Sequence, residues 1–192
     1  MIQNKHRKCV ICRELFIKRS MTHKVCGPDC AQVHIQQTKD KAERKETIKR
    51  KKELKTRSDY IKEAQTIFNR YIRERDKNKP CICCGMPLVL SAIGGGFDCG
   101  HYRSVGSAPH LRYDERNAHG QRKQCNRWGA GRAVDYRLGL IARIGQHEVD
   151  DLEANNDVKK YTIEELKTIS SLYKAKLKGL TNESARANQE SF

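Results

Sequence analysis

The chain is poor in apolar and aromatic residues. Hydrophobic residues make up 37% of its 192 positions and aromatic residues 6%, against 32% charged residues. This composition is too polar for one large, well-filled core, so we expect a small globular part joined to extended, highly charged helix. A chain that is short of core often uses bound metal as a staple.

Long apolar runs are also missing. No stretch approaches the length of a membrane span, and no amphipathic stretch has an aromatic-rich apolar face, which argues against a membrane partner. Residues 1–9 are polar and basic with no apolar run behind them, which predicts that there is no signal peptide. We therefore expect a soluble, cytoplasmic protein, in which nine cysteines indicate metal binding rather than disulfides.

Acidic residues are outnumbered by basic ones. The chain has 39 Lys and Arg against 23 Asp and Glu, which gives a formal net charge of +16. An excess of this size favours a polyanion as partner, and nucleic acid is the default. A merely solubilising surface is the alternative interpretation.

Residues 36–58 are predicted to form a basic helix or linker. Good helix formers dominate, no Gly or Pro interrupts them, and only three residues are apolar, so the helix has almost no core face. Ion pairs on its surface would explain its folding but not its net charge, so we expect it to contact the DNA backbone. The contacts assigned to it are Lys49, Arg50, Lys51 and Lys52.

Residues 1–35 hold a first cysteine group, in which a Cys-x2-Cys pair is followed by a Cys-x3-Cys pair. Four thiolates close a tetrahedral zinc site, and residues 15–17 between the pairs could form a short strand. A redox pair is disfavoured because no βαβ pattern surrounds it. His23 or His34 could replace one cysteine, although a solvated histidine is the simpler interpretation. The predicted ligands are Cys9, Cys12, Cys26 and Cys30.

Three amphipathic helices are predicted within a globular domain at residues 59–180. The apolar spacing indicates helices near 58–77, with Ser58 as its N-cap, and near 131–145. The last helix starts at Thr162, where Glu165 completes a capping box.

The remaining segments of this half are predicted to be irregular. Residues 81–128 are rich in turns, with a short strand expected at 86–93. Residues 146–160 are acidic at first and then form a loop around 155–156, and the polar tail 181–192 is expected to be disordered.

The segment from Cys81 to Asn126 is the most informative part of the chain. It is dense in cysteine, histidine, aspartate and asparagine, which are the ligand types of a zinc site beside a second, catalytic metal centre. Cleavage of a phosphodiester needs a base to activate water and a divalent metal to hold the phosphate. His101, Asn117 and His119 supply suitable side chains in that order. The combination predicts a nuclease site braced by metal.

The chain resembles the NinG family of lambdoid phage recombination proteins, also called Rap, over nearly its whole length. The resemblance is densest at R-E-R-D-K-N-K-P-C-I-C-C-G (73–85), D-C-G-H-Y-R-S (98–104), A-P-H-L-R-Y-D-E-R-N-A-H (108–119), Q-C-N (124–126) and R-I-G-Q-H-E-V-D-D-L-E-A-N (143–155). The family is associated with structure-specific cleavage of branched DNA, including Holliday junctions and D-loops. Its central segment is similar to the HNH, or ββα-metal, nucleases, whose fold places a β-hairpin and a helix around one divalent ion.

The resemblance implies roles for five residues. His101 would be the general base, and Asn117 would orient its imidazole or the surrounding loop. Asn126 would help to hold the catalytic ion. Asp98 could be a further ligand, although it lies three residues before His101 and many HNH sites place the acid directly before the base. His119 could hold catalytic metal or zinc.

One position departs from the family pattern. The pattern Q-C-x-x-C-N is replaced by Q-R-K-Q-C-N, so that Arg122 stands where a zinc ligand is expected, and arginine offers no acceptor. Cys81, Cys84 and Cys125 would then need a fourth ligand. We favour Cys99. The alternatives are Cys83, His119 or a three-residue site completed by water.

The expected fold is α+β and mostly helical. It has a small zinc-braced ββα-metal core with flanking helices, an N-terminal zinc module with four cysteine ligands, and a long basic helix. The cofactors implied are two structural Zn²⁺ ions and a catalytic Mg²⁺ or Mn²⁺ ion. The side chains expected to clamp DNA phosphates around the site are Arg103, Arg112, Arg116, Arg122, Lys123 and Arg127.

The expected function is that of a metal-dependent endodeoxyribonuclease. It would cut branched DNA during phage recombination in the cytoplasm of the bacterial host. Paired cuts would suit a homodimer, and other phage recombination proteins are expected partners. The alternative is a non-catalytic zinc protein that binds DNA as an accessory recombination factor.

Overall fold

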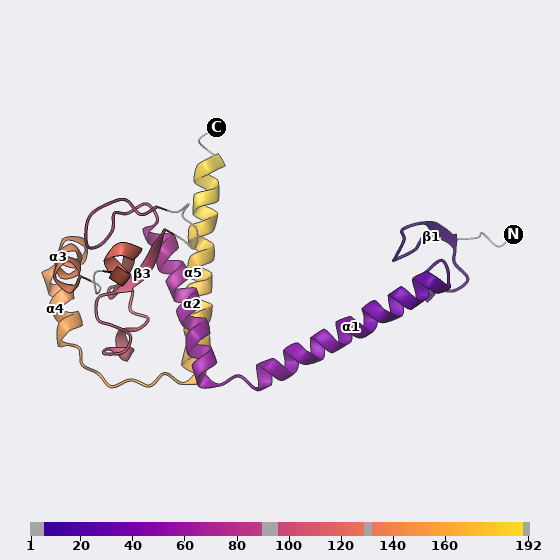
Figure 1. Cartoon of the computed structure of the whole chain (residues 1–192), viewed down its shortest axis with the longest axis horizontal. Helices are drawn as coiled ribbons and strands as arrows, with labels where there is room; N and C mark the ends of the chain where they lie inside the picture. Colours follow the sequence, from indigo (N-terminus) through magenta and orange to yellow (C-terminus); the bar gives the residue numbers. More distant parts are fainter. Residues whose placement is uncertain (1–5, 90–95, 129–131, 190–192) are drawn as a thin grey trace. The chain divides into compact units, whose positions relative to one another are not determined.

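The computed structural model describes residues 6–89, 96–128 and 132–189, with side chains as far as residue 183. It divides into two compact units, Met1–Lys55 and Thr56–Phe192 (Figure 1). The predicted basic helix therefore belongs to the same unit as the first cysteine group. Among the described residues, no helix is long and apolar enough to cross a membrane.

The first unit is a small hairpin followed by one long helix. Strands β1 (His6–Lys8) and β2 (Leu15–Ile17) pair antiparallel, which confirms the strand predicted at 15–17. Helix α1 (Pro28–Glu53) begins inside the first cysteine group rather than at residue 36. Proline is favoured at the first helical position because its φ is already set and its missing amide is not needed there. None of the residues of α1 is buried, as expected of a helix without a core face.

Two long helices lie side by side in the second unit (Figure 1). Helix α2 (Arg57–Asp76) starts from Thr56, which forms a capping box with Asp59, so the predicted cap at Ser58 is displaced by two residues. Thr56 and Ser58 can both cap a helix. Thr56 is the cap because its amide donates to the Asp59 carboxylate while its hydroxyl accepts from the Asp59 amide.

Helix α5 (Ile163–Gln189) starts as predicted and continues further than predicted. Thr162 and Glu165 form the expected capping box. The helix then passes through Gly179 and extends to Gln189, which corrects the expectation of a disordered tail at 181–192 as far as the described residues go. A glycine in a helix costs only about 1 kcal/mol, and no proline follows to stop the helix.

A β-hairpin lies between this helix pair and a second pair of helices (Figure 1). Strands β3 (Phe97–His101) and β4 (Ala118–Arg122) are antiparallel, with His101 opposite Ala118. The segment between them carries the short helix η1 (Pro109–Leu111). After β4 the chain forms the π-helical turn η2 (Gln124–Trp128) and helix α3 (Ala133–Ile144). The order strand, strand, helix is that of the predicted core, and the nuclease assignment itself stays a prediction.

Helix α4 (Gln146–Ala154) occupies the acidic stretch for which no helix was predicted, and the loop predicted around 155–156 follows it. Val149 and Leu152, three residues apart, are buried against the α3 side of the unit. Two apolar residues are too weak a periodic signal among so many acids, and the tertiary contact supplies what the sequence pattern lacks. The strand predicted at 86–93 is represented by a single β-bridge between Pro87 and Pro80. Residues 90–93 lie outside the described part of the chain.

Two apolar clusters hold the hairpin from opposite sides. The cluster on the α2–α5 side is aromatic, and Phe68 packs edge-on against Tyr173 with 4.8 Å between ring centroids. On the other side, the Tyr136 hydroxyl of α3 donates a 2.8 Å hydrogen bond to the Gly100 carbonyl of β3. The buried residues of this second cluster are Ile82, Ala108, Leu111, Tyr136, Leu140, Val149 and Leu152. A mostly helical α+β fold is confirmed.

Candidate metal centres and active site

The first cysteine group is assembled as predicted. The sulfur atoms of Cys9, Cys12, Cys26 and Cys30 all lie within 4.8 Å of one another. Four thiolates at this spacing can close the tetrahedral shell of a zinc ion. His23 is not among them, because its Nδ1 accepts a 3.2 Å hydrogen bond from the amide of Arg19.

Backbone amides around the first cysteine group favour the thiolate form of Cys9. Arg13 adopts a left-handed conformation with φ of 69°, which lets its amide return to the carbonyl of Cys9. Burial would raise the pKa of Cys9, but hydrogen bonds from the backbone at Ile11, Cys12 and Cys26 lower it to about 6. Amide groups directed at a sulfur favour the thiolate, which is the form that binds metal.

The second cysteine group contains three members. The sulfur atoms of Cys81, Cys84 and Cys125 lie within 4.8 Å of one another. Gly85, with φ of 68°, closes the turn that brings Cys81 and Cys84 together, and such a φ favours glycine. No fourth His, Cys, Asp or Glu among the described residues joins this group.

The neighbours of Cys81 explain how the group is held without a cysteine at position 122. The backbone amide of Arg122 donates a 3.3 Å hydrogen bond to the Cys81 sulfur. A hydrogen bond from Cys83, supported by the backbone amides of Cys84 and Arg122, lowers the pKa of Cys81 to about 4 despite its burial. Cys83 itself accepts a 2.9 Å hydrogen bond from the Gln121 amide. Cys83 therefore supports the group from beside it.

Cys99 does not complete this group, which corrects our expectation. It lies on β3, where it packs against the aromatic cluster of α2 and α5 and lines a separate pocket. Phe97, two residues earlier on the same strand, is the residue that packs against the second cysteine group. Phe97 lies opposite Arg122, whose amide contacts Cys81, whereas Cys99 lies about 6–7 Å further along the strand. Burial raises the pKa of the Cys99 thiol to about 12.

A polar pocket of about 380 Å³ lies between α2, β3 and η2, and two predicted site residues meet in it. The Nδ2 atom of Asn126 donates a 3.1 Å hydrogen bond to the carboxylate of Asp98. Arg127 donates two further bonds to the same carboxylate, at 2.9 and 3.1 Å. Burial raises the pKa of Asp98, but Arg127 and Asn126 outweigh it and hold the pKa below its ordinary value. The pocket is lined by Thr66, Asn69, Arg73, Asp98, Cys99, Asn126 and Arg127.

His101 does not line this pocket, although it lies two residues from Cys99 on the same strand. Its Nε2 lies 3.0 Å from the carbonyl oxygen of Arg112. A carbonyl can only accept, so Nε2 carries the hydrogen and Nδ1 is the basic nitrogen of the neutral ring. Burial lowers the pKa of His101 below its ordinary value, with the Arg112 carbonyl opposing, so the ring is neutral near pH 7.

Asn117 is fully buried and holds the loop that follows β3. Its Nδ2 donates to the carbonyls of Arg103 and Leu111, at 3.0 and 3.2 Å, and its Oδ1 accepts from the Arg103 amide at 2.8 Å. Leu111 directly precedes Arg112, whose carbonyl receives the His101 ring. Of the two roles predicted for Asn117, the structure supports the positioning of the loop and shows no contact with the imidazole.

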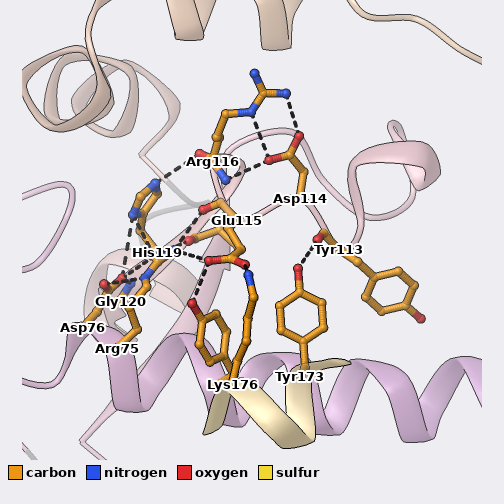
Figure 2. Close-up of polar contacts among 12 residues, drawn as sticks. Arg75, Asp76, Tyr113, Asp114, Glu115, Arg116, His119, Gly120, Tyr173 and Lys176 are labelled. Carbon is orange, nitrogen blue, oxygen red and sulfur yellow. Dashed lines mark hydrogen bonds and ion pairs between the residues drawn. The ribbon is translucent and has the colours of Figure 1, made fainter. Parts of the chain in front are cut away.

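His119 lies in a buried ionic cluster and joins neither metal group, which corrects its predicted role (Figure 2). Its Nε2 donates to the carbonyl of Arg116 at 3.1 Å, and its Nδ1 accepts from Arg75 at 3.1 Å. Asp76, fully buried, is bound by Arg75 at 2.8 Å and by the amide of Gly120 at 2.8 Å. With both ring nitrogens engaged, His119 has no lone pair left for an ion.

Three of the arginines predicted to clamp DNA are bound within the fold instead. Arg103 donates to the carbonyl of Leu152 at 2.9 Å and to that of Asn155. Arg116 pairs with Asp114 and Glu148, and Arg112 donates to Gln65 and Val105. The guanidinium groups of these three arginines bind loops and helices of the same unit. Fewer of their donors are therefore available to bind DNA phosphates. Arg127 is paired with Asp98, whereas Lys49, Arg50, Lys51 and Lys52 are exposed on α1.

Sequence reasoning missed three residues of the pocket. Thr66, Asn69 and Arg73 lie on α2, opposite the apolar stripe that identified the helix. Their spacing of three and four residues places them on one helical face. A polar face is the ordinary solvent side of an amphipathic helix, so only the position of β3 and η2 shows that it faces a pocket.

These features define a two-unit α+β protein with two cysteine groups that could hold zinc and a polar pocket beside a β-hairpin. The chain belongs to the family described as the Bacteriophage Lambda NinG protein, whose model matches residues 1–183. Protein ninG of Escherichia phage lambda is 39% identical over 194 residues, covering 92% of this chain and 93% of that protein.

Two further relatives match with similar coverage. Protein ninG of Escherichia phage 933W is 38% identical over 205 residues, and protein ninG of Salmonella phage P22 is 37% identical over 207 residues. Each match covers 97% of this chain and all of the relative. No solved structure matches the chain. Membership of a phage protein family is therefore established, as the sequence resemblance predicted.

Proposed function

We propose that this protein is a metal-dependent endonuclease that cuts branched DNA during phage recombination. The observation that carries the proposal is the meeting of Asp98 and Asn126, which are 28 positions apart in the sequence and 3.1 Å apart in the pocket. They come from β3 and from the turn after β4, and they meet beside the second cysteine group. Both residues were assigned to a catalytic ion from the family resemblance alone.

The donors in the pocket fit a hard divalent cation. The Asp98 carboxylate and the Asn126 amide oxygen are ligands of the kind that Mg²⁺ and Mn²⁺ prefer. Arg127 now balances the charge of Asp98, so binding of a cation there would release this guanidinium toward the DNA. A divalent ion in this place supplies Lewis-acid stabilisation of the phosphate and of the leaving oxygen.

His101 is suited to the part of general base. Its Nδ1 carries no hydrogen in the neutral tautomer, and Nε2 is held by the Arg112 carbonyl. In the proposed reaction, Nδ1 takes the proton of the water that attacks phosphorus. Asn117 maintains the loop that presents this carbonyl.

The proposal is tested by incubating the purified protein with a labelled four-way junction and Mg²⁺ or Mn²⁺. We expect cleavage that Asp98→Ala, Asn126→Ala and His101→Ala each reduce by at least about 100-fold. Asp157→Asn, an exposed carboxylate outside the pocket, serves as the control. Equal cleavage by Asp98→Ala and Asp157→Asn would remove Asp98 from the site.

A non-catalytic DNA-binding protein is the second candidate, and the position of His101 favours it. The proposed base is not among the residues that line the pocket. The exposed basic helix α1 and the two cysteine groups would serve binding equally well. Junction binding without cleavage, in either metal, would favour this second function.

A further inference from the structure

We propose that Arg73, with Asn69 and Thr66, forms a phosphate-binding wall that holds one phosphodiester group of DNA against the pocket. The inference rests on the proposed function, since it names the part of the substrate that this face of α2 would bind. None of the three residues was assigned a role from the sequence or from the family resemblance.

The first support is position. Thr66, Asn69 and Arg73 occupy one face of α2, and they line the same pocket of about 380 Å³ as Asp98 and Asn126. The opposite face of α2 is buried in the aromatic cluster through residues such as Phe68. That packing fixes the rotation of α2 about its axis. The face that carries Thr66, Asn69 and Arg73 is therefore held toward the pocket.

The second support is charge. Arg73 is exposed, and it forms no hydrogen bond or ion pair with any residue in the described part of the chain. Arg75, two residues further on, is bound to Asp76 at 2.8 Å, and Arg127 is bound to Asp98 at 2.9 Å. Arg73 is therefore the cation of this pocket whose donors are left for an anion.

The third support is the chemistry of the three side chains. A guanidinium presents a planar fork of donors that matches two oxygens of a phosphate. The Asn69 Nδ2 group adds a neutral donor on the same face, since its Oδ1 accepts from Gln65. The Thr66 hydroxyl donates to the Lys62 carbonyl at 2.8 Å, so Thr66 contributes its shape to this wall rather than a donor. Asp98 lies on the other side of the pocket, where its charge would repel a phosphate unless a cation intervenes. The pocket thus has one wall suited to a phosphate and one suited to a metal ion.

The test compares Arg73→Ala with Arg70→Ala. Arg70 is exposed on the same helix and does not line the pocket, so its removal changes the net charge equally. Binding of a fluorescent four-way junction is measured by anisotropy on the zinc-loaded protein without a chelator, with Ca²⁺ in place of Mg²⁺ or Mn²⁺, and a gel checks that the junction stays uncut. We expect Arg73→Ala to weaken binding about tenfold, and Arg70→Ala to change it by less than about twofold.

Salt dependence gives a second measurement that does not depend on cleavage. Loss of one phosphate contact should lower the slope of log K against log salt by about 1 for Arg73→Ala alone. Arg73→Lys should keep the slope and recover only part of the affinity, because an ammonium lacks the fork. Circular dichroism of each variant confirms that α2 is intact.

The outcomes separate this inference from the proposed function. If both arginine variants bind alike with the same salt slope, the phosphate-binding wall is refuted, even where the wild-type protein cleaves junctions. If Arg73→Ala alone loses affinity while the wild-type protein cleaves nothing in Mg²⁺ or Mn²⁺, the wall stands and the nuclease proposal falls.

Discussion

The backbone amide of Arg122 donates a 3.3 Å hydrogen bond to the sulfur of Cys81. Position 122 is where the pattern Q-C-x-x-C-N has a cysteine. The arginine cannot bind zinc through its side chain, yet its backbone lies beside the sulfur of a potential ligand. The backbone of position 122 therefore lies close to the three-cysteine group.

Arg122→Cys should strengthen zinc binding at the second cysteine group. A cysteine there would add a fourth thiolate to the three of Cys81, Cys84 and Cys125, which is the full set of a structural zinc site. We expect zinc to be released to a chelator at least about tenfold more slowly than from the wild-type protein. Lys123→Cys, which adds a thiol one residue further on, should have no such effect. Equal release from the two variants would contradict the prediction.

Cys81→Ser and Cys99→Ser should differ in their zinc content. Cys81 belongs to the second group, whereas Cys99 packs against the aromatic cluster. Elemental analysis should find two zinc ions per chain in the wild-type protein and in Cys99→Ser, and one in Cys81→Ser. Loss of zinc from Cys99→Ser would reinstate Cys99 as a ligand.

Asp76→Asn should destabilise the second unit by about 3 kcal/mol, because it removes a fully buried carboxylate that several partly buried cations share. The carboxylate accepts from Arg75 and from the Gly120 amide (Figure 2). It also lies 3.2 Å from Lys79 Nζ. These contacts, with His119, hold the pKa of Asp76 far below its ordinary value against the effect of burial. Urea unfolding measures the change, and Asp157→Asn, which is exposed, should cost less than about 0.5 kcal/mol.

His119 should make the protein less stable in mild acid. Burial lowers the pKa of His119 below the ordinary value of 6.5, with Asp76 opposing. As the pH falls below about 6.5, His119 is protonated in the unfolded chain before it is protonated in the folded protein. Protonation therefore favours the unfolded state, and the free energy of unfolding that is present above this pH decreases. His119→Gln removes the titration but keeps one donor and one acceptor. Its free energy of unfolding, with zinc saturating, should fall less than that of the wild-type protein between pH 7.5 and 5; parallel curves would exclude His119 as the cause.

Two helical glycines should respond to alanine in opposite directions. A Cβ at Gly139 of α3 would lie 1.8 Å from the carbonyl oxygen of Ile82, whereas one at Gly179 of α5 would meet nothing within 4 Å. Gly139→Ala should destabilise the protein by about 1–3 kcal/mol through overpacking, and Gly179→Ala should stabilise it by up to about 1 kcal/mol. Thermal unfolding of both variants provides the comparison.

Local signals predicted most of the elements. The capping box of Thr162 and Glu165, the apolar stripe of α2 and the short strand at 15–17 all depend on neighbours in the sequence, and all three are present. Helix α4 was missed because its stability comes from two buried contacts with α3 rather than from its own periodicity. The continuation of α5 beyond Gly179 was missed because a helix already formed can propagate through residues that would not start one.

The residues of the candidate site were predicted correctly in the first cysteine group and only in part elsewhere. The first cysteine group needs only two tight loops, and it is assembled as expected. The roles of Cys99 and His119 depended on what each strand position packs against. Cys99 packs on the aromatic cluster, and His119 is bound by Arg75 in the ionic cluster. The same packing brings Asp98 to Asn126 and leaves His101 beside the pocket rather than in it.

The sequence by itself determined the family, the basic charge and the first group of four cysteines, because these follow from composition and from residues close together in the chain. Only the tertiary structure decided which cation faces which anion. Arg103 and Arg116 are bound inside the fold, while Arg73 faces the pocket unpaired among the described residues. The physical reason is that the environment of a charged side chain depends on groups brought to it by packing. At position 122 the same packing sets the backbone of an arginine beside the sulfur of Cys81.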